Sequence, residues 1–265
     1  QDMSDIYDES TRFYPLGRSA ARSDQPLHIP ASEFGFTGIS YHSGLPVARH
    51  NGVPVAPVFD RRARRELFLK RLLLDIPLSV MALVLLSPLL LVIALAIRLS
   101  GPGPVIFQQK RVGLNGADFT LYKFRTIAAE HQDDSGIAQV VTDDKRVTPV
   151  GRLLRATSLD ELPQLWNILV GDMAVIGPRP MVRGQLAAGR DYREHVPYYD
   201  YRTLVRPGLS GWAQANGYRG STQDPAAAHE RIDHDCAYVQ NFSIWLDFKI
   251  IGLTITREFL TGSGV

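Results

Sequence analysis

The chain has 265 residues, of which 45% are hydrophobic and 21% charged, and its formal net charge is +2. This length suits one large domain, or one domain with an extension, and the composition excludes a chain that is disordered throughout. The small net charge gives no bulk electrostatic support for nucleic-acid binding. Cys236 is the single cysteine, so an internal disulfide is excluded and a reducing compartment is expected. The first twenty residues are polar and mixed in charge, so we expect no cleavable signal peptide there.

Residues 1–60 differ from the rest of the chain. They are rich in Pro, Gly, Ser and His, and their apolar patches are short, as in PVAPVF at 54–59. We interpret them as an N-terminal extension that lies over the main domain, residues 61–265, or over a neighbouring subunit. The second arrangement would make the protein a homodimer.

Residues 61–75, RRARRELFLKRLLLD, have the pattern of a basic amphipathic helix. Glu66 is the one acidic residue among the first eleven positions, which hold six cations: Arg61, Arg62, Arg64, Arg65, Lys70 and Arg71. We expect residues 61–71 to lie among anionic lipid headgroups.

A run of 22 residues without a charge, 76–97, follows directly. Its length reaches the hydrocarbon thickness of a bilayer, and a soluble core helix seldom lacks a polar face over such a length. Ser87-Pro88 lies at its centre, where the proline removes a backbone hydrogen bond and its ring meets the carbonyl of Val84. Positive charge flanks both ends, as on the cytoplasmic side of membrane segments. We expect a re-entrant membrane helix, about 76–98, that breaks at Ser87-Pro88; a spanning helix and a buried soluble helix are the alternatives.

The remaining patterns predict a mixed α/β fold that is mainly helical. VIFQQKRVG (105–113) and FTLYKFRT (119–126) flank an Asn-Gly turn signal and predict a β-hairpin. The polar residues 128–145 predict a surface loop. Helical patterns return at 147–156, 160–171, 226–241 and 243–260. Trp245, near the start of the last helix, places that helix either at a membrane interface or in the core.

Asp160 and Glu161 are adjacent acids within a basic segment. Ser158 and Glu161 fit the S-x-x-E capping box, which would give the acids a purely structural role. Pro163 complicates that interpretation because it would fall at the fifth helical position and remove a hydrogen bond. Either the helix begins nearer Leu162, with both acids on the preceding turn, or its first turn is irregular.

Both possibilities place carboxylates at the start of a helix, where backbone N–H groups favour the ionised acid and attract phosphate. An ionised carboxylate beside bound phosphate is suited to nucleophilic attack, as in enzymes with acyl-phosphate intermediates. Two such acids would repel a pyrophosphate, so we expect Asp160 and Glu161 to bind Mg²⁺.

Basic side chains near these acids are candidates for binding phosphate. Pro178 and Pro180 restrict the backbone around Arg179 and would hold its guanidinium in place. Lys123 and Arg125 share one face of the predicted hairpin, where they line a site or form its exposed side. The candidate set is Arg179, Lys123, Arg125, Arg155 and Arg146.

Other common sites lack support. The chain has no G-x-x-x-x-G-K-[ST] loop, no G-x-G-x-x-G at a strand–helix junction and no G-x-S-x-G. His229 and His234 are five positions apart, off one helical face, and Cys236 is the only further ligand nearby, so a zinc site there is not expected.

Six blocks along residues 66–260 occur in a characteristic order: KRLLLD (70–75), GPGPVIFQQKRVGLNG (101–116), FTLYKFRT (119–126), RVTPVGRLLRATSLDELPQLWNILVGDMAVIGPRP (146–180), RPGLSGWAQANGYRG (206–220) and NFSIWLDFKIIGLT (241–254). This order resembles the bacterial sugar transferases, the monotopic phosphoglycosyl transferases that begin exopolysaccharide and O-antigen assembly. The match is specific because several independent blocks agree.

The resemblance implies a catalytic domain on the cytoplasmic face of the bacterial inner membrane, held by a re-entrant helix that breaks at Ser87-Pro88. It implies that Asp160 is the nucleophile and that Glu161 is its partner in handling Mg²⁺ and charge. The family moves a phospho-sugar from a nucleotide diphosphate sugar to a polyprenyl phosphate, through a covalent phospho-sugar aspartate, and releases the nucleoside monophosphate. Undecaprenyl phosphate, a UDP-sugar and membrane lipids are therefore the expected partners.

Some features depart from the family pattern. Some members carry four spanning helices ahead of this domain, and this chain is similar to the shorter forms. Ile127 and Ala174 replace a common methionine and serine. GWAQANGYRGST (211–222) looks most like members that transfer glucose 1-phosphate from UDP-glucose, although Ser221 stands where those commonly have glutamate. We expect glucose, with galactose as the alternative.

Two other functional classes remain open from the sequence. One is a membrane-anchored hydrolase of nucleotide sugars or lipid phosphates, and the other is a non-catalytic scaffold of a polysaccharide assembly complex. Dependence of nucleotide release on a polyprenyl acceptor separates the first from a transferase, and the absence of any turnover identifies the second.

Overall fold

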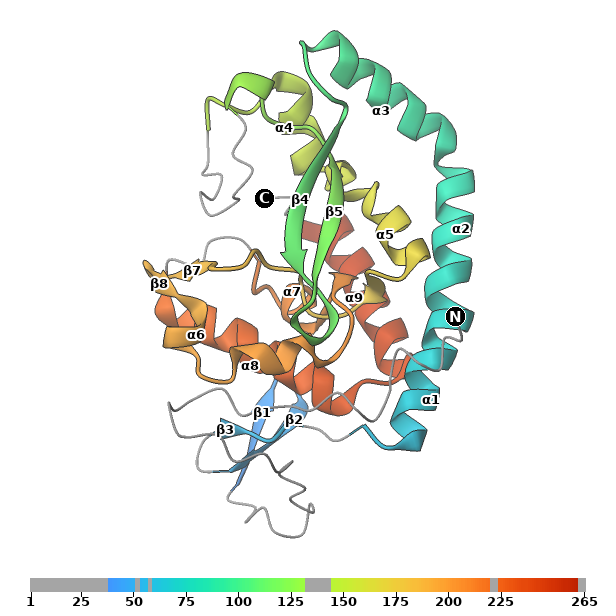
Figure 1. Cartoon of the computed structure of the whole chain (residues 1–265). Coiled ribbons are helices and arrows are strands. Elements are labelled where there is room, and N and C mark those ends of the chain that lie inside the picture. The colour runs from blue at the N-terminus through green and yellow to red at the C-terminus, as the bar shows by residue number, and fades with distance from the viewer. Residues whose placement is uncertain (1–37, 51–52, 57–58, 132–143, 220–223, 262–265) are drawn as a thin grey trace.

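The computed structural model describes residues 38–50, 53–56, 59–131, 144–219 and 224–261, and it has the expected mixed α/β fold with helices in the majority (Figure 1). The strands are β1 (Gly38–His42), β2 (Leu45–His50), β3 (Val53–Pro54), β4 (Ile106–Val112), β5 (Asp118–Phe124), β6 (Ala174–Ile176), β7 (Leu186–Ala187), β8 (Arg190–Asp191) and β9 (Gly208–Ser210). The helices are α1 (Arg61–Lys70), α2 (Ile76–Leu85), α3 (Ser87–Leu99), α4 (Pro149–Ala156), α5 (Gln164–Val170), α6 (Tyr192–His195), α7 (Trp212–Ala215), α8 (Pro225–Asn241) and α9 (Ile244–Thr261).

The strands form small separate sheets rather than one large one. β1, β2 and β3 form an antiparallel meander, β4 pairs with β5 as the predicted hairpin, and β7 pairs with β8. β6 and β9 are parallel neighbours, with Ala174 opposite Gly208. The hairpin turn uses Asn115 and Gly116 at positive φ, 54° and 77°, as its Asn-Gly signal predicts.

A long bent helix pair lies along one side of the molecule. α1 continues through a π-helical turn, Arg71–Asp75, into α2, and α3 follows after a bend of 63° (Figure 1). Within the described residues, each helix alone is too short or too polar to cross a membrane, whereas the bent pair together meets the length and composition expected of a broken span or a re-entrant loop. The bend lies at Leu86, next to the predicted break.

Ser87 and Pro88 explain the bend chemically. Pro88 occupies the first turn of α3, where its missing N–H costs least. The Ser87 hydroxyl donates a hydrogen bond of 2.8 Å to the carbonyl oxygen of Val84, the group that the proline cannot reach. The break therefore leaves this carbonyl satisfied without solvent.

The two faces of the bent pair differ in exposure. Its inner face packs on the hairpin and on α4 and α5, with Ile93 and Ile97 buried against Phe124 and Leu154. Its outer face leaves large apolar side chains exposed, for example Leu91 at 72% and Leu99 at 78%. The alternative of a buried soluble helix does not fit the described structure.

The basic helix is only partly as predicted. Lys70 and Arg71 were expected among lipid headgroups, but both are buried. Lys70 Nζ lies 3.0 Å from an Asp247 carboxylate oxygen and donates to the Tyr238 hydroxyl at 2.7 Å. Arg71 donates to the carbonyl oxygens of Ile168 and Leu169, both at 2.8 Å, at the end of α5. Both cations share the helical face that carries the buried Leu67 and Leu74, and their partners come from distant segments of the chain.

The described part of the N-terminal extension packs on the main domain. Val47 of β2 is fully buried in the core with Trp212, Tyr238 and Ile250. The Trp212 indole donates to the carbonyl oxygen of His42 at 3.0 Å. Residues 1–37 lie outside the described residues, so the homodimer remains a prediction.

The predicted helices at 147–156, 226–241 and 243–260 correspond to α4, α8 and α9. α9 belongs to the core through Leu246 and Ile250, both buried, while its Trp245 side chain is 83% exposed. Of the predicted surface loop 128–145, residues 132–143 lie outside the described residues.

Candidate active site

Asp160 and Glu161 lie on a short 3-10 turn, Leu159–Glu161, between α4 and α5. Ser158 precedes the turn in the left-handed region, with φ 56°, and its side chain caps no helix. The capping box is therefore wrong. α5 begins only at Gln164, so both acids lie on the preceding turn, the arrangement that Pro163 favoured in the sequence.

Glu161 is held by two cations from distant parts of the chain. One of its carboxylate oxygens accepts from Lys123 Nζ at 2.7 Å and from Arg179 Nη2 at 2.5 Å, and the other lies 3.4 Å from Arg179 Nη1. Burial alone would raise the pKa of Glu161, but Arg179 and Lys123 hold that pKa well below its ordinary value. Glu161 is therefore a fixed anion that orients both cations.

Asp160 has the opposite environment. It is 8% exposed, and no residue in the described part of the chain donates a hydrogen bond to its carboxylate. Burial raises the pKa of Asp160, Glu161 adds to the rise, and the charges of Lys123, Arg155 and Arg179 oppose it. Its carboxylate oxygens are thus uncommitted and close to positive charge.

Arg179 is positioned through its own backbone. Arg202 donates to the carbonyl oxygen of Arg179 at 2.6 Å, and Arg111 donates to the carbonyl oxygen of Pro180 at 3.1 Å. Gly177 is required just before this turn, because a Cβ there would meet the carbonyl oxygen of Arg206 at 2.3 Å. The Arg179 side chain remains 38% exposed, so its outer edge is open to a ligand.

The supporting roles of Arg202 and Arg111 could not be predicted from the sequence. Arg202 is buried and is anchored by Asp235 of α8, at 2.8 Å. Arg111 is also buried, and burial together with the charge of Arg179 lowers its pKa to about 10. Arg202 lies outside the six sequence blocks, and although Arg111 lies within the block 101–116, both act through carbonyl groups that are distant in sequence.

Asn167 joins the acid-bearing segment to the hairpin. From α5, its side-chain NH₂ donates to the carbonyl oxygen of Thr120 at 2.7 Å, and its side-chain oxygen accepts from the backbone N–H of Tyr122 at 3.0 Å. Asn167 is fully buried. This pair of bonds fixes Lys123, the next residue of β5, relative to Glu161.

The other predicted phosphate-binding residues are distributed unevenly. Arg155, at the end of α4, is close enough to oppose the raised pKa of Asp160. Arg146 forms an ion pair of 2.6 Å with Asp144, and it lowers the pKa of Asp144 to about 2, with a smaller contribution from Arg155. Arg146 is thus paired with Asp144, and its binding of phosphate stays a prediction.

Arg125, predicted to bind phosphate, is held by backbone carbonyl groups, and its binding of phosphate stays a prediction. Arg125 is buried and donates to the carbonyl oxygens of Ile97 at 3.2 Å, Gly101 at 2.9 Å and Pro102. β5 ends at Phe124, so the alternation of side chains along the strand does not extend to Arg125. The Arg125 side chain faces the end of α3 and not Glu161. Its role is to join the hairpin to the bent helix pair.

The charges around the acids suit a diphosphate. Arg111, Lys123, Arg155 and Arg179 surround Asp160 and Glu161, which leaves an excess of two positive charges. The acids also fit Mg²⁺, a cation that prefers carboxylate oxygens. The oxygens of Asp160 are uncommitted and one oxygen of Glu161 has only the 3.4 Å contact.

The family is shown by comparison with known proteins. Residues 65–261 match the family described as bacterial sugar transferase, which covers most of the chain, so the protein belongs to that family.

Curated relatives agree with this assignment. The chain is 44% identical over 213 residues to a UDP-glucose:undecaprenyl-phosphate glucose-1-phosphate transferase of Klebsiella pneumoniae, covering 80% of this chain and 45% of that protein. It is 48% identical over 199 residues to the exopolysaccharide production protein PSS of Rhizobium leguminosarum bv. phaseoli, covering 75% of this chain and 99% of that protein. It is also 44% identical over 198 residues to a UDP-N-acetylgalactosamine-undecaprenyl-phosphate N-acetylgalactosaminephosphotransferase of Aeromonas hydrophila. That match covers 74% of this chain and 45% of that protein. The chain thus spans about half the length of several relatives that it matches.

Proposed function

We propose that this protein transfers a hexose 1-phosphate from a UDP-sugar to undecaprenyl phosphate and releases UMP. The observation that carries the proposal is the unequal state of the two acids: Glu161 is fixed by Lys123 and Arg179, whereas the Asp160 carboxylate is uncommitted. The names of the relatives from Klebsiella and Aeromonas support a UDP-sugar donor and this lipid acceptor.

The reaction proceeds in two displacements at one phosphorus atom. An oxygen of the Asp160 carboxylate attacks the sugar-bearing β-phosphorus, and the bond from that phosphorus to the oxygen bridging the α-phosphate breaks, so UMP leaves with the bridging oxygen. A phosphate oxygen of undecaprenyl phosphate then attacks the same phosphorus. The bond to Asp160 breaks, and the product is undecaprenyl diphospho-sugar with the carboxylate regenerated.

The surrounding cations bind and orient the diphosphate. The guanidinium of Arg179 is held by Glu161, and the backbone carbonyl of Arg179 is held by Arg202. The exposed edge of the guanidinium can therefore bind phosphate oxygens without reorganisation. Lys123 and Arg155 lie on the side of Asp160 and lower the repulsion between its carboxylate and the diphosphate.

Asp160 and Glu161 would hold Mg²⁺, which, when bound, neutralises charge on the diphosphate and on the departing phosphate. This assignment rests on the carboxylate oxygens that remain available at the two acids.

The sugar is proposed to be glucose. The GWAQANGYRGST block resembles glucose-type members, and the Klebsiella relative is named for glucose. The Aeromonas relative is equally identical to this chain and is named for N-acetylgalactosamine, so overall identity does not select the sugar. Trp212 is a buried core residue of this block, while Ser221 lies outside the described residues.

We further propose that the bent helix pair enters the cytoplasmic leaflet of the bacterial inner membrane and returns. The exposed apolar side chains of α2 and α3, the satisfied Val84 carbonyl at the bend and exposed Trp245 on α9 all support this arrangement. A buried soluble helix would leave no such apolar surface.

Release of UMP from UDP-glucose, UDP-galactose and UDP-N-acetylgalactosamine tests the function. The full chain, in lipid or detergent with Mg²⁺, is assayed with and without undecaprenyl phosphate, beside Asp160→Asn. Acceptor-dependent release with one sugar is expected. Intact-mass measurement without acceptor should show one phospho-hexose on the wild-type chain and none on the variant.

Steady release without acceptor would identify a hydrolase, and absence of release with every sugar would favour a scaffold. An adduct of equal amount on Asp160→Asn would contradict the role of Asp160 even if transfer occurs.

A further inference from the structure

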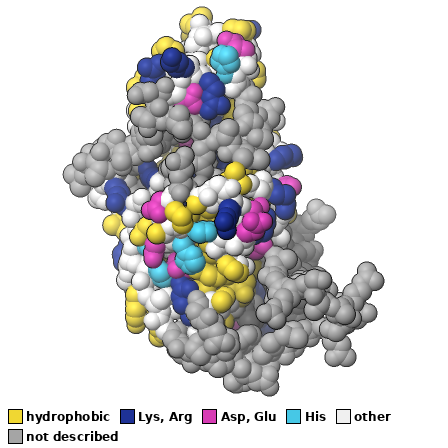
Figure 2. Space-filling model, turned by 90° about the vertical axis from the view of Figure 1, so that its left-hand side faces the viewer, with side chains coloured by type: hydrophobic (Ala, Val, Ile, Leu, Met, Phe, Trp, Pro, Cys, Tyr) yellow, Lys and Arg dark blue, Asp and Glu magenta, His cyan; other side chains and the backbone are white. Residues whose placement is uncertain are grey.

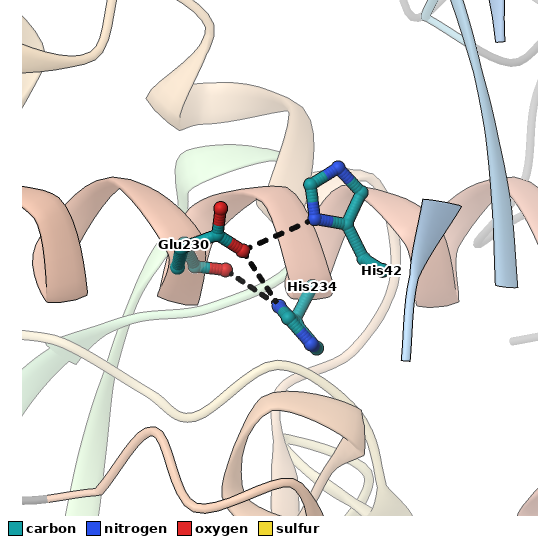
Figure 3. A group of neighbouring side chains, drawn as sticks. All are labelled: His42, Glu230 and His234. Carbon is teal, nitrogen blue, oxygen red and sulfur yellow. Dashed lines mark hydrogen bonds and ion pairs between the residues drawn. The ribbon is translucent and has the colours of Figure 1, made fainter. Parts of the chain in front are cut away.

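A second group of ligating side chains lies away from the acid pair, where the β1–β3 meander packs on α8. His42 of β1, Glu230 and His234 of α8 point toward one another (Figure 3). One ligand atom of each residue lies within 4.8 Å of the other two. His42 and His234 are buried, while the side chain of Glu230 is 44% exposed.

The distances suit a small dication. His42 Nδ1 and His234 Nδ1 lie 3.2 Å and 3.6 Å from the same Glu230 carboxylate oxygen. Ligands of a tetrahedral zinc ion, with bonds of about 2.0–2.1 Å, are separated by roughly 3.3 Å. Two of the three separations therefore already match, and a small approach of the imidazoles would complete the set. The exposed side of Glu230 leaves room for water as the fourth ligand.

The remote nitrogen of each imidazole is held by a hydroxyl group. His42 Nε2 lies 3.1 Å from Ser40 Oγ, and His234 Nε2 lies 2.8 Å from Ser43 Oγ. A metal at Nδ1 requires the proton on Nε2, and a hydrogen-bond acceptor there fixes both the tautomer and the ring orientation. Both rings thus have the outer partner that metal-ligating histidines commonly have.

Two existing contacts compete with a metal. The carbonyl oxygen of Glu230 lies 2.8 Å from His234 Nδ1, so that nitrogen would exchange a hydrogen bond for the metal. Arg49 lies 3.3 Å from His42 Nε2, but it also has Asp233 as a closer partner, at 2.7 Å. Neither contact occupies the carboxylate of Glu230 or the space between the three ligand atoms.

We propose that His42, Glu230 and His234 bind one Zn²⁺ ion, which fastens the meander to α8. The proposal is independent of the transfer reaction. His229 and Cys236, which are near His234 in the sequence, take no part: His229 Nε2 lies 2.6 Å from the Tyr198 hydroxyl, and Cys236 packs in a hydrophobic cluster. The additional ligand comes from His42, 188 positions before Glu230, a proximity that sequence spacing does not reveal.

The face that carries α6, β7 and β8 also shows histidines among acidic and basic side chains (Figure 2).

Titration of the chelator-treated full chain with Zn²⁺ tests the proposal. One equivalent should bind and raise the thermal unfolding midpoint. His42→Ala and His234→Ala should each weaken binding by more than about 100-fold, because loss of an outer partner alone costs about 10–100-fold. Ser43→Ala, which removes such an outer partner, should weaken Zn²⁺ binding by about 10–100-fold. Co²⁺ in place of Zn²⁺ should give the intense visible absorption of a tetrahedral site.

Matched variants separate this site from others. Glu230→Gln keeps the shape of the side chain but removes the charged ligand. It should weaken Zn²⁺ binding, and it tests the site even if an alanine variant fails to fold. His229→Gln removes a neighbouring histidine of the same helix and should bind as wild type does. The combined Asp160→Asn and Glu161→Gln variant should also bind one equivalent. Absence of stoichiometric binding, or binding unchanged in Glu230→Gln, would overturn the proposal.

Discussion

Asp160 and Glu161 are adjacent in the chain, but their carboxylates have opposite effects on folding. The raised pKa of Asp160 means that the folded chain binds its proton more tightly than the unfolded chain does. The ionised carboxylate therefore costs stability above the folded pKa, and the cost disappears as the pH falls toward the ordinary value of 3.8. Asp160→Asn should stabilise the protein at neutral pH by about 1 kcal/mol, on the order of the cost of an unpaired buried polar group.

Thermal unfolding of wild type and Asp160→Asn between neutral and acidic pH measures this difference. The advantage of the variant should be full at neutral pH and absent near pH 3.8. Transfer by the wild type should likewise fall with decreasing pH as Asp160 takes up its proton. A variant less stable than wild type at neutral pH would show that the carboxylate is satisfied by other groups.

Glu161 should behave in the reverse manner. The pKa of Glu161 is lower in the folded chain than its ordinary value of 4.5, so the ionised carboxylate stabilises the fold. This stabilisation is fully present above pH 4.5 and is lost only as the pH falls through the much lower folded pKa. Glu161→Gln leaves Lys123 and Arg179 without their shared anion and should destabilise the fold by roughly 2 kcal/mol, within the range for hydrogen bonds between charged groups. The partial exposure of Arg179 keeps the expected cost moderate.

The same unfolding experiment, run on Glu161→Gln, checks this expectation, with Asp160→Asn as its neighbouring control. The two variants should shift the midpoint in opposite directions at neutral pH. Equal shifts would mean that the assigned pairing of Glu161 is incorrect.

At the scale of elements, the relation between α5 and β5 depends on Asn167. Asn167→Ala would leave the Tyr122 N–H and the Thr120 carbonyl unsatisfied, at about 1–3 kcal/mol for each buried group. It should also lower kcat, because the turn that carries the acids would lose its register with Lys123. A misplacement of about 1 Å in a catalytic group can cost on the order of 100-fold.

Asn241→Ala is the matched control for Asn167→Ala. Its side chain donates to the carbonyl oxygen of Pro46 at 2.7 Å, at the contact of α8 with the meander. Both variants should lose stability, but only Asn167→Ala should lower the kcat of the folded protein. An equal loss of kcat in both would assign Asn167 a general structural role.

The elements that the sequence predicts well are those defined by local patterns. The hairpin follows from alternation and its Asn-Gly turn, and α4, α8 and α9 follow from helical periodicity. The buried partners of Lys70 and Arg71 and the parallel pairing of β6 with β9 come from distant segments, which no local pattern contains.

The candidate site was predictable to a similar degree. Motif blocks identified Asp160, Glu161, Lys123 and Arg179, and the structure brings them together. Strand alternation does not determine the direction of Arg125, because β5 ends at Phe124 and the side chain donates to carbonyl groups at and after the end of α3. Side chains that act through a distant carbonyl, as Arg202 does, leave no signal in a single sequence.

At the scale of the whole molecule, the proposed membrane arrangement makes the bend between α2 and α3 the feature that keeps the domain on one side. Pro88→Ala restores an N–H that can donate to the Val84 carbonyl, so α1 to α3 can become one straight helix. Residues 61–99 would then extend about 58 Å at about 1.5 Å per residue, enough to cross a bilayer. We therefore expect Pro88→Ala to move the chain after α3 toward the opposite side in part of the population.

Labelling with a membrane-impermeant maleimide in vesicles of defined orientation measures this outcome. Cys236 is buried, so a cysteine introduced at Ser100, after α3, or at Arg62, in α1, supplies the reactive thiol. In the native bend, Ser100→Cys and Arg62→Cys should both react from the cytoplasmic side, because the two ends of a re-entrant pair return to one surface. With Pro88→Ala, Ser100→Cys should react increasingly from the other side while Arg62→Cys is unchanged. Reaction of Ser100→Cys only from the opposite side without Pro88→Ala would show that the pair spans the membrane, and the cations that flank it would then require a different explanation.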